Sequence, residues 1–186
     1  MFQNKNIVIG ITGGIACYKA CEIISFLVHE GANIDVIMTK NATEFITPLT
    51  LETLSKHKVT VDMFEKKDHV EVEHISLARK ADLFLIVPAT ANILGKVANG
   101  IADDMLSTTI MATPAPVIFA PAMNNGMYTN KIVQDNIKKL KKYGYHFVSP
   151  IEGNLACGYQ AIGKLAKKET IIKELEKIIG GIKNEI

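Results

Sequence analysis

The residues best suited to carry chemistry follow directly after an apolar stretch of the chain. Residues 116–119 have the apolar pattern of a strand, and residues 120–128 then read Ala-Pro-Ala-Met-Asn-Asn-Gly-Met-Tyr. Pro121 ends the strand and fixes the local backbone, while the amide of Asn124 can donate to a carboxylate and accept from an amine. Ligands of parallel α/β sheets bind beyond the carboxyl ends of the strands. Residues 120–128 are therefore predicted to line a binding pocket.

A glycine-rich turn, Gly-Ile-Thr-Gly-Gly-Ile at residues 10–15, favours phosphate binding. It joins the first predicted strand to the first predicted helix, where glycines admit a phosphate and the helix N-terminus supplies free N–H groups. The second strand ends in Met-Thr-Lys-Asn at residues 38–41, without the acidic residue that binds a ribose diol in dinucleotide folds. These groups favour FMN over NAD or FAD, although a glycine turn alone can also serve only packing.

Three further segments carry candidate groups. Residues 88–93, Pro-Ala-Thr-Ala-Asn-Ile, follow an apolar strand, and their small side chains would let a flat ring lie against the backbone beside the Asn92 amide. His74 begins a short predicted helix, where a histidine beside apolar residues more often packs than catalyses. Cys157 lies in a glycine-rich loop at residues 153–164, and such loops commonly carry function. Cys17 and Cys21 share a helix face and are expected to pack in the core, so no metal site is predicted.

The elements that must position these groups alternate between strand and helix patterns. Strands are predicted over residues 7–11, 33–38, 83–87, 117–120 and 146–148, and helices over residues 16–30, 73–81, 103–112, 129–143 and 170–179. Strands that are apolar throughout must be covered by helices on both faces. Gly180 and Gly181 are expected to cap the last helix. The prediction is a single α/β domain over residues 1–186, with a three-layer, doubly wound, Rossmann-like or flavodoxin-like parallel sheet.

Composition excludes several classes of protein. The 186 residues carry a net charge of only +2, which gives no reason to expect nucleic acid or a membrane surface as partner. The first apolar run, residues 7–11, is too short for a signal peptide or a membrane span. Three cysteines without regular spacing form no disulfide framework, and the protein is expected in the cytoplasm.

Four segments together resemble the flavin-dependent cysteine decarboxylases, most closely the phosphopantothenoylcysteine decarboxylases, over nearly the whole chain. Residues 121–128 are similar to the family's Pro-x-Met-Asn-x-x-Met-Trp/Tyr signature, and residues 88–93 to its Pro-Ala-Ser/Thr-Ala-Asn-Thr segment, with Ile93 in place of threonine. Residues 74–77 match its His-Ile-x-Leu element. Residues 156–163 resemble its Ala-Cys-Gly-x-x-Gly-x-Gly substrate lid, except that Ala161 replaces a glycine.

The resemblance implies FMN-dependent decarboxylation of 4'-phosphopantothenoylcysteine to 4'-phosphopantetheine in coenzyme A biosynthesis. Asn124 would bind the substrate carboxylate, His74 would act in the oxidation step, and Cys157 would donate a proton. The implied cofactor-binding residues are Gly13, Gly14, Ile15, Thr39, Lys40, Asn41, Thr90, Ala91, Asn92, Ile93, Ser107 and Met123. The implied substrate-binding residues are Asn124, Met127, Asn154, Leu155 and Ala156.

Other members of this fold remain as alternatives: a flavin prenyltransferase, a peptidyl-cysteine decarboxylase of lantibiotic maturation, and a non-catalytic phosphatase-regulatory flavoprotein. A prenyltransferase has an Arg-Glu-x-Pro-Leu element where residues 121–124 stand here, and the regulatory proteins often carry long acidic tails. The resemblance also implies a homotrimer or homododecamer with flavin sites at subunit contacts. The sequence is compatible with a complete decarboxylase or with the front part of a fused decarboxylase and phosphopantothenoylcysteine synthetase.

Overall fold

A five-stranded parallel sheet forms the centre of the protein. The computed structural model describes residues 1–64, 72–154, 156, 158 and 160–182. The strands are β1 (Asn6–Ile11), β2 (Asn33–Met38), β3 (Leu83–Ala89), β4 (Val117–Pro121) and β5 (His146–Phe147), in the order β2-β1-β3-β4-β5. Every residue of β3 is buried, because this strand is apolar throughout and lies at the middle of the sheet.

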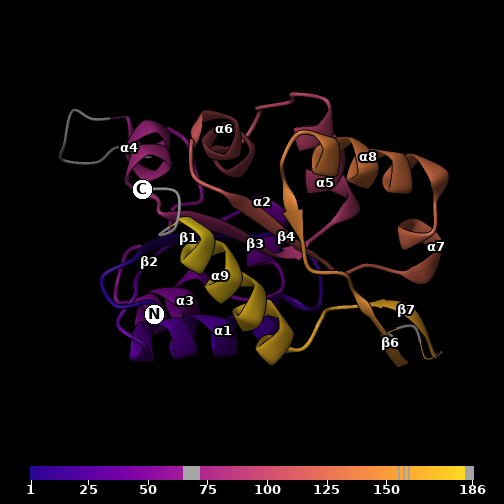
Figure 1. Ribbon diagram of the computed structural model, residues 1–186, viewed down its shortest axis with the longest axis horizontal. Helices are drawn as coiled ribbons and strands as arrows, with labels where there is room; N and C mark the ends of the chain where they lie inside the picture. Colours follow the sequence, from indigo (N-terminus) through magenta and orange to yellow (C-terminus); the bar gives the residue numbers. More distant parts are fainter. Residues whose placement is uncertain (65–71, 155, 157, 159, 183–186) are drawn as a thin grey trace.

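Helices cover both faces of the sheet, as Figure 1 shows. One face packs against α1 (Cys17–His29), α3 (Pro48–Ser55) and α9 (Lys168–Ile182). The other packs against α4 (Glu73–Lys80), α5 (Ala91–Ala98), α6 (Met105–Ala112) and α8 (Lys131–Lys142). Two separate buried clusters result, one on each face. The predicted three-layer, doubly wound α/β fold is confirmed, with the flavodoxin-like strand order.

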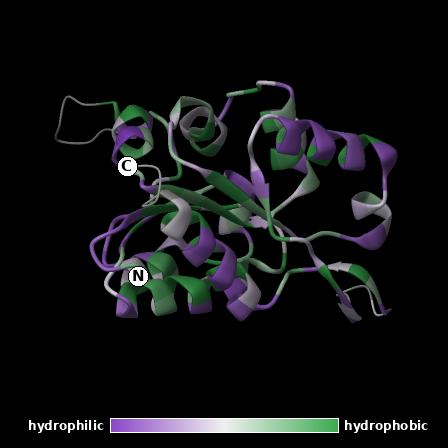
Figure 2. Ribbon diagram, viewed as in Figure 1, coloured by the Kyte–Doolittle hydropathy of each residue, from purple (hydrophilic) through white to green (hydrophobic). Residues whose placement is uncertain are grey.

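The hydropathy of the ribbon follows these layers. Figure 2 shows apolar residues along the central strands and hydrophilic residues along α8. Only Ile137 and Leu140 of α8 are buried, so this helix presents one narrow apolar stripe to the sheet and a charged face to solvent. No helix in the described ranges has the length and apolarity needed to cross a membrane.

A two-stranded antiparallel hairpin projects from the main body near α7 (Asn125–Tyr128) (Figure 1). It consists of β6 (Ile151–Asn154) and β7 (Gln160–Lys164). The sequence predicted a glycine-rich loop here, and that prediction was wrong. Met123 N donates a 3.0 Å hydrogen bond to Gly163 O, which anchors the hairpin beside β4. Gly163 has φ +136°, and a Cβ there would lie 2.3 Å from Met123 O, so only glycine permits this contact.

Other segments also differ from the sequence-based expectation. Gly180 and Gly181 lie inside α9, because the buried residues of that helix pack it onto the sheet in spite of the low helix propensity of glycine. The helices α2 (Lys40–Thr43), α3 and α5 were not predicted. All three are short, and α2 and α5 directly follow strands, where the chain turns at the edge that carries the candidate site.

Candidate active site

The carboxyl ends of β1 and β3 are tied together by one buried hydroxyl. Thr12 Oγ1 donates a 2.7 Å hydrogen bond to Pro88 O and accepts a 3.1 Å hydrogen bond from Thr90 N. The chain leaves β1 toward α1 and leaves β3 toward α5, which lie on opposite faces of the sheet. Such a divergence opens a crevice at the sheet edge, where ligands of this architecture bind.

A cavity of about 510 Å³ lies at this edge. It brings together many of the residues predicted to bind FMN, namely Gly13, Thr39, Lys40, Asn41, Thr90, Asn92 and Ile93. They come from the first turn of the fold, from α2 and from the start of α5. The first cavity therefore joins the three separate segments from which the sequence predicted the cofactor site.

The polar groups of the first cavity fit a phosphate ester. Thr39 Oγ1 is buried and has no hydrogen-bond partner within the described part of the chain, although Thr39 precedes α2 in a capping position. A buried hydroxyl without a partner is unfavourable, and a phosphate oxygen would accept a hydrogen bond from it. Lys40 adds an exposed cation at the same wall. A Cβ on Gly13 would lie 2.5 Å from Asn41 Cβ, so the glycine allows the two loops to touch.

A second cavity, of about 580 Å³, adjoins the first and shares Gly13, Thr90 and Met127 with it. It brings five further candidates together with Asn124, namely Gly14, Ile15, Met123, Asn154 and Ala156. The two hairpin residues among them, Asn154 and Ala156, reach the cavity because the hairpin is anchored at Met123. Most residues predicted to bind the cofactor thus line the first cavity, and the described residues predicted to bind the substrate line the adjoining second cavity.

Asn124 is held in a defined orientation. It is the N-cap of α7, and its Oδ1 accepts a 2.8 Å hydrogen bond from Gly126 N. The Asn124 carbonyl oxygen accepts a further hydrogen bond from Tyr128 N at 2.9 Å. Because the cap fixes Oδ1 on the backbone, Nδ2 is the end of the amide that can act as a donor toward a ligand.

Some predicted site residues lie elsewhere. His74 is half-buried on α4, its Nδ1 is buried without a hydrogen-bond partner among the described residues, and it lines neither cavity. Ala91 also lines neither cavity. Leu155 and Cys157 lie outside the residues that the structure describes. The single chain therefore assembles the Asn124 side of the site, and the roles of His74 and Cys157 stay predictions.

Ser107 lines neither cavity, and its side chain instead forms hydrogen bonds at the start of α6. Its side chain is fully buried. Ser107 N donates a 2.8 Å hydrogen bond to Asp104 Oδ1, and Ser107 Oγ accepts a 3.2 Å hydrogen bond from Asp104 N. This reciprocal arrangement is a capping box at the start of α6. Its geometry favours a helix-capping role over the predicted cofactor contact.

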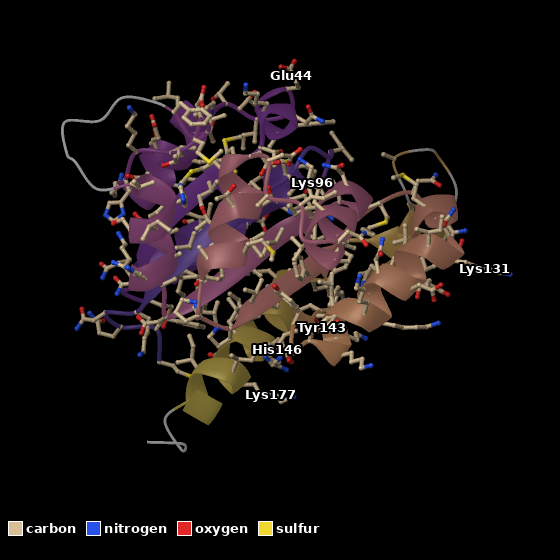
Figure 3. The ribbon with its side chains drawn as sticks, turned by 90° about the horizontal axis from the view of Figure 1, so that it is seen from above. Glu44, Lys96, Lys131, Tyr143, His146 and Lys177 are labelled. Atoms are coloured by element: carbon tan, nitrogen blue, oxygen red, sulfur yellow. The ribbon has the colours of Figure 1, made fainter. Side chains whose placement is uncertain are left out.

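Lys96 is a cavity residue that the sequence reasoning missed. Its Nζ lies 2.6 Å from Asp103 Oδ1 and 2.7 Å from Asp104 Oδ2, and all three residues line the first cavity. In Figure 3 Lys96 lies toward the middle of the view, unlike the peripheral Lys131 and Lys177. Burial alone would lower the pKa of Lys96, but the two carboxylates raise it. Burial would likewise raise the pKa of Asp104, but Lys96 and Ser107 lower it.

We expect Lys96→Met to weaken FMN binding by about tenfold and to lower thermal stability, because it leaves the half-buried Asp104 carboxylate without its cation. Since the folded-state pKa of Asp104 is depressed, the ion pair stabilises the fold above the ordinary aspartate value of 3.8 and loses that effect as the pH falls through the lowered pKa. The melting temperatures of wild type and variant should therefore differ most near neutral pH and converge in acid. Lys96→Arg is the matched control, and equal differences at both pH values would contradict this role.

Known proteins are similar to this chain in both sequence and fold. The sequence model of the Flavoprotein family matches residues 1–180. The coenzyme A biosynthesis bifunctional protein CoaBC of Borreliella burgdorferi is 55% identical over 173 residues, covering 93% of this chain and 44% of that protein. The probable phosphopantothenoylcysteine decarboxylase of Streptococcus mutans is 43% identical over 177 residues, covering 94% of this chain and 99% of that protein.

A solved structure agrees with these sequence matches. The FMN-dependent cysteine decarboxylase SpaF superposes with a TM-score of 0.83 at 30% identity, covering 94% of this chain and 96% of that one. The chain spans less than half the length of the bifunctional relative and nearly the full length of the Streptococcus protein. A family match over residues 1–180, together with these identities, shows that the chain belongs to the Flavoprotein family.

Proposed function

We propose that this protein catalyses the FMN-dependent decarboxylation of 4'-phosphopantothenoylcysteine to 4'-phosphopantetheine. One observation carries the proposal. The first cavity, whose polar groups fit a phosphate, adjoins the second cavity, which contains Asn124, and the two share Gly13, Thr90 and Met127. The similar proteins include a probable phosphopantothenoylcysteine decarboxylase and an FMN-dependent cysteine decarboxylase, and both names support the same substrate and cofactor. Coenzyme A biosynthesis is the role named for the bifunctional relative.

FMN would occupy the first cavity with its phosphate at the Gly13 turn. The Thr39 hydroxyl, which has no hydrogen-bond partner among the residues that the structure describes, would donate to a phosphate oxygen, and Lys40 would add a positive charge. Thr90, whose own hydroxyl accepts from Ile93 N at 3.4 Å, positions the first turn of α5 beside this site. When bound, the flavin supplies an electron sink, so the carboxylate can leave without forming an unstabilised carbanion.

The residues of the chain would bind and orient the substrate. Asn124 Nδ2 would donate to the cysteine carboxylate, while its Oδ1 stays on Gly126 N. Met127 and Ile15, both exposed along the cavity wall, would exclude water from the reacting carbon. His74 would move a proton in the oxidation step, and Cys157 would return one to the product; both roles rest on the family resemblance.

The expected partners follow from the same proposal. A phosphopantothenoylcysteine synthetase activity must supply the substrate, and the relative named as bifunctional for coenzyme A biosynthesis supports such a link. We propose that the protein acts in the cytoplasm as a homotrimer or homododecamer. Exposed apolar side chains that line the two cavities, including Ile15, Phe64 and Met127, are compatible with subunit contacts there.

Purified protein is expected to be yellow, to release FMN on denaturation, and to release carbon dioxide from 4'-phosphopantothenoylcysteine. The reason is that the Thr39 hydroxyl and the Gly13 turn form a site for one phosphate, and that the end of β2 carries no acidic residue to bind a ribose diol. Absorbance spectra and mass spectrometry of the released cofactor check the first part, and coupled carbon dioxide detection checks the second. Colourless protein that FMN cannot reconstitute, or bound NAD, would contradict the cofactor assignment.

A further inference from the structure

Asn92 and Lys96 lie on one face of α5, and both line the first cavity. They are four residues apart, so the two side chains are neighbours on the helix surface, one turn from each other. Thr90 fixes the start of this helix, since its Oγ1 accepts a 3.4 Å hydrogen bond from Ile93 N. The helix therefore presents an amide and a cation side by side to the cavity in which FMN would bind.

Two carboxylates from the turn before α6 hold the Lys96 ammonium in place. Lys96 Nζ lies 2.6 Å from Asp103 Oδ1 and 2.7 Å from Asp104 Oδ2. Asp104 is itself fixed as the N-cap of α6, because its Oδ1 accepts a hydrogen bond from Ser107 N. The Lys96 side chain is only 19% exposed, and Figure 3 shows it toward the middle of the view. The ammonium is therefore held at the cavity wall and does not extend into solvent.

The Lys96 ammonium keeps one hydrogen-bond donor for a ligand. An ammonium group carries three donors and no acceptor. Asp103 and Asp104 use two of them, and the described residues provide no third acceptor. A cation that is largely removed from water is unfavourable unless its hydrogen bonds are formed. The third N–H is therefore available to a polar atom of a molecule bound in the first cavity.

We propose that Lys96 donates to the heteroatom edge of the FMN ring, beside Asn92, and thereby stabilises reduced FMN relative to oxidised FMN. The heteroatom edge of a flavin offers both donors and acceptors, which suits an amide next to an ammonium. Reduction adds two electrons and one proton to the ring and leaves one negative charge on it at neutral pH. A fixed cation binds this anionic ring more tightly than the neutral one.

This inference rests on the proposed function and deepens it. The proposed decarboxylation requires the flavin to take up electrons, and a charge beside the ring sets how readily the flavin does so. Lys40 provides the contrast, because it lies at the phosphate end of the same cavity. The charge of the cofactor phosphate is the same in both redox states, so Lys40 strengthens the binding of both states alike.

The test is a redox titration of the FMN-loaded protein with dithionite and an indicator dye. Lys96→Met should weaken the binding of reduced FMN about tenfold more than that of oxidised FMN, which lowers the two-electron potential by about 30 mV. Lys96→Arg keeps the charge and should keep the preference within about twofold of wild type. Lys40→Met is the matched control. It should weaken both redox states equally, in fluorescence titrations of the apoprotein, and leave the potential unchanged.

A double variant separates the lysine from the carboxylate that it leaves behind. In Lys96→Met alone, the unpaired Asp104 could itself disfavour an anionic ring. Lys96→Met combined with Asp104→Asn keeps the net charge of the three side chains, and asparagine is an equally good N-cap for α6. Its potential should stay as low as that of Lys96→Met. A wild-type potential in the double variant, or an equal shift in Lys40→Met, would overturn the role of Lys96.

The titration needs no substrate, so its result is independent of the decarboxylase assay. The predicted shifts in a protein that releases no carbon dioxide from 4'-phosphopantothenoylcysteine would support the role of Lys96 and refute the decarboxylase. Carbon dioxide release by a protein whose potential is the same with Lys96 and with methionine would refute the role of Lys96 and support the decarboxylase.

Discussion

Asn124→Asp should lower kcat/KM by at least about 10³-fold while FMN stays bound. A single lost donor to developing charge typically costs about 10²- to 10³-fold, and here a negative charge would also face the substrate carboxylate. The new carboxylate can still accept the 2.8 Å hydrogen bond from Gly126 N, so the start of α7 is preserved. The defect should therefore be chemical and not structural. Steady-state kinetics together with the flavin spectrum checks this expectation.

Asn130→Asp provides the matched control for that substitution. Asn130 caps α8 in the same way, since its Oδ1 accepts a 2.9 Å hydrogen bond from Ile132 N, and it lines neither cavity. This variant should keep wild-type kinetics and stability, because aspartate and asparagine are equally good N-caps. Near-normal decarboxylation by Asn124→Asp would show that the carboxylate binds elsewhere. Equal damage from both variants would point to helix capping as the cause.

Gly13→Ala should weaken FMN binding by about 10²-fold or more. The added Cβ would lie 2.5 Å from Asn41 Cβ and 2.9 Å from Asn41 C and O. Backbone atoms cannot swing aside as the end of a flexible side chain can, so the start of α2 must move away from the first turn. Thr39 and Lys40 lie at that helix start, and their contacts with the cofactor phosphate would be lost with the movement. Fluorescence titration of the apoprotein with FMN measures the loss.

Gly95→Ala is the comparison for this steric argument. Gly95 lies within α5, and the closest atom to an added Cβ is Asn136 Nδ2 at 3.8 Å, an ordinary contact. Alanine favours a helix interior more than glycine does, so this variant should bind FMN normally and be at least as stable as wild type. FMN affinity that is unchanged in Gly13→Ala would mean that the contact with Asn41 does not shape the cofactor site.

The central sheet was predictable because its signal is local. Runs of apolar, mostly β-branched residues such as β3 must be buried on both faces, and each strand lies within about two residues of its predicted bounds. Parallel strands joined by helices place their carboxyl ends at one edge of the sheet, so the turns after β1, β2, β3 and β4 had to meet there. For this reason the sequence also predicted that Gly13, Thr39, Thr90 and Asn124 belong to one region.

The hairpin and the continuation of α9 through Gly180 and Gly181 were not predictable in the same way. Residues 151–164 show no regular alternation of apolar and polar side chains, and the position of the hairpin depends on the contact between Gly163 and Met123 at another part of the chain. In α9, tertiary packing of Ile171, Leu175 and Ile179 outweighs the unfavourable helix propensity of two glycines. The apolar spacing in this segment predicted the helix over residues 170–179, but it gave no sign that the helix continues through the two glycines.

The sequence by itself determined the family resemblance, the α/β class and the residue types that suit FMN and a carboxylate, since these depend on short motifs and on strand hydrophobicity. The tertiary structure alone decided that Ser107 serves a capping box and that Lys96 joins two aspartates at the cavity. The sequence of 186 residues does not show which side chains a given lysine contacts in the folded protein. Its partners are set by the helix or hairpin that carries it, and the packing of those elements is a property of the whole fold.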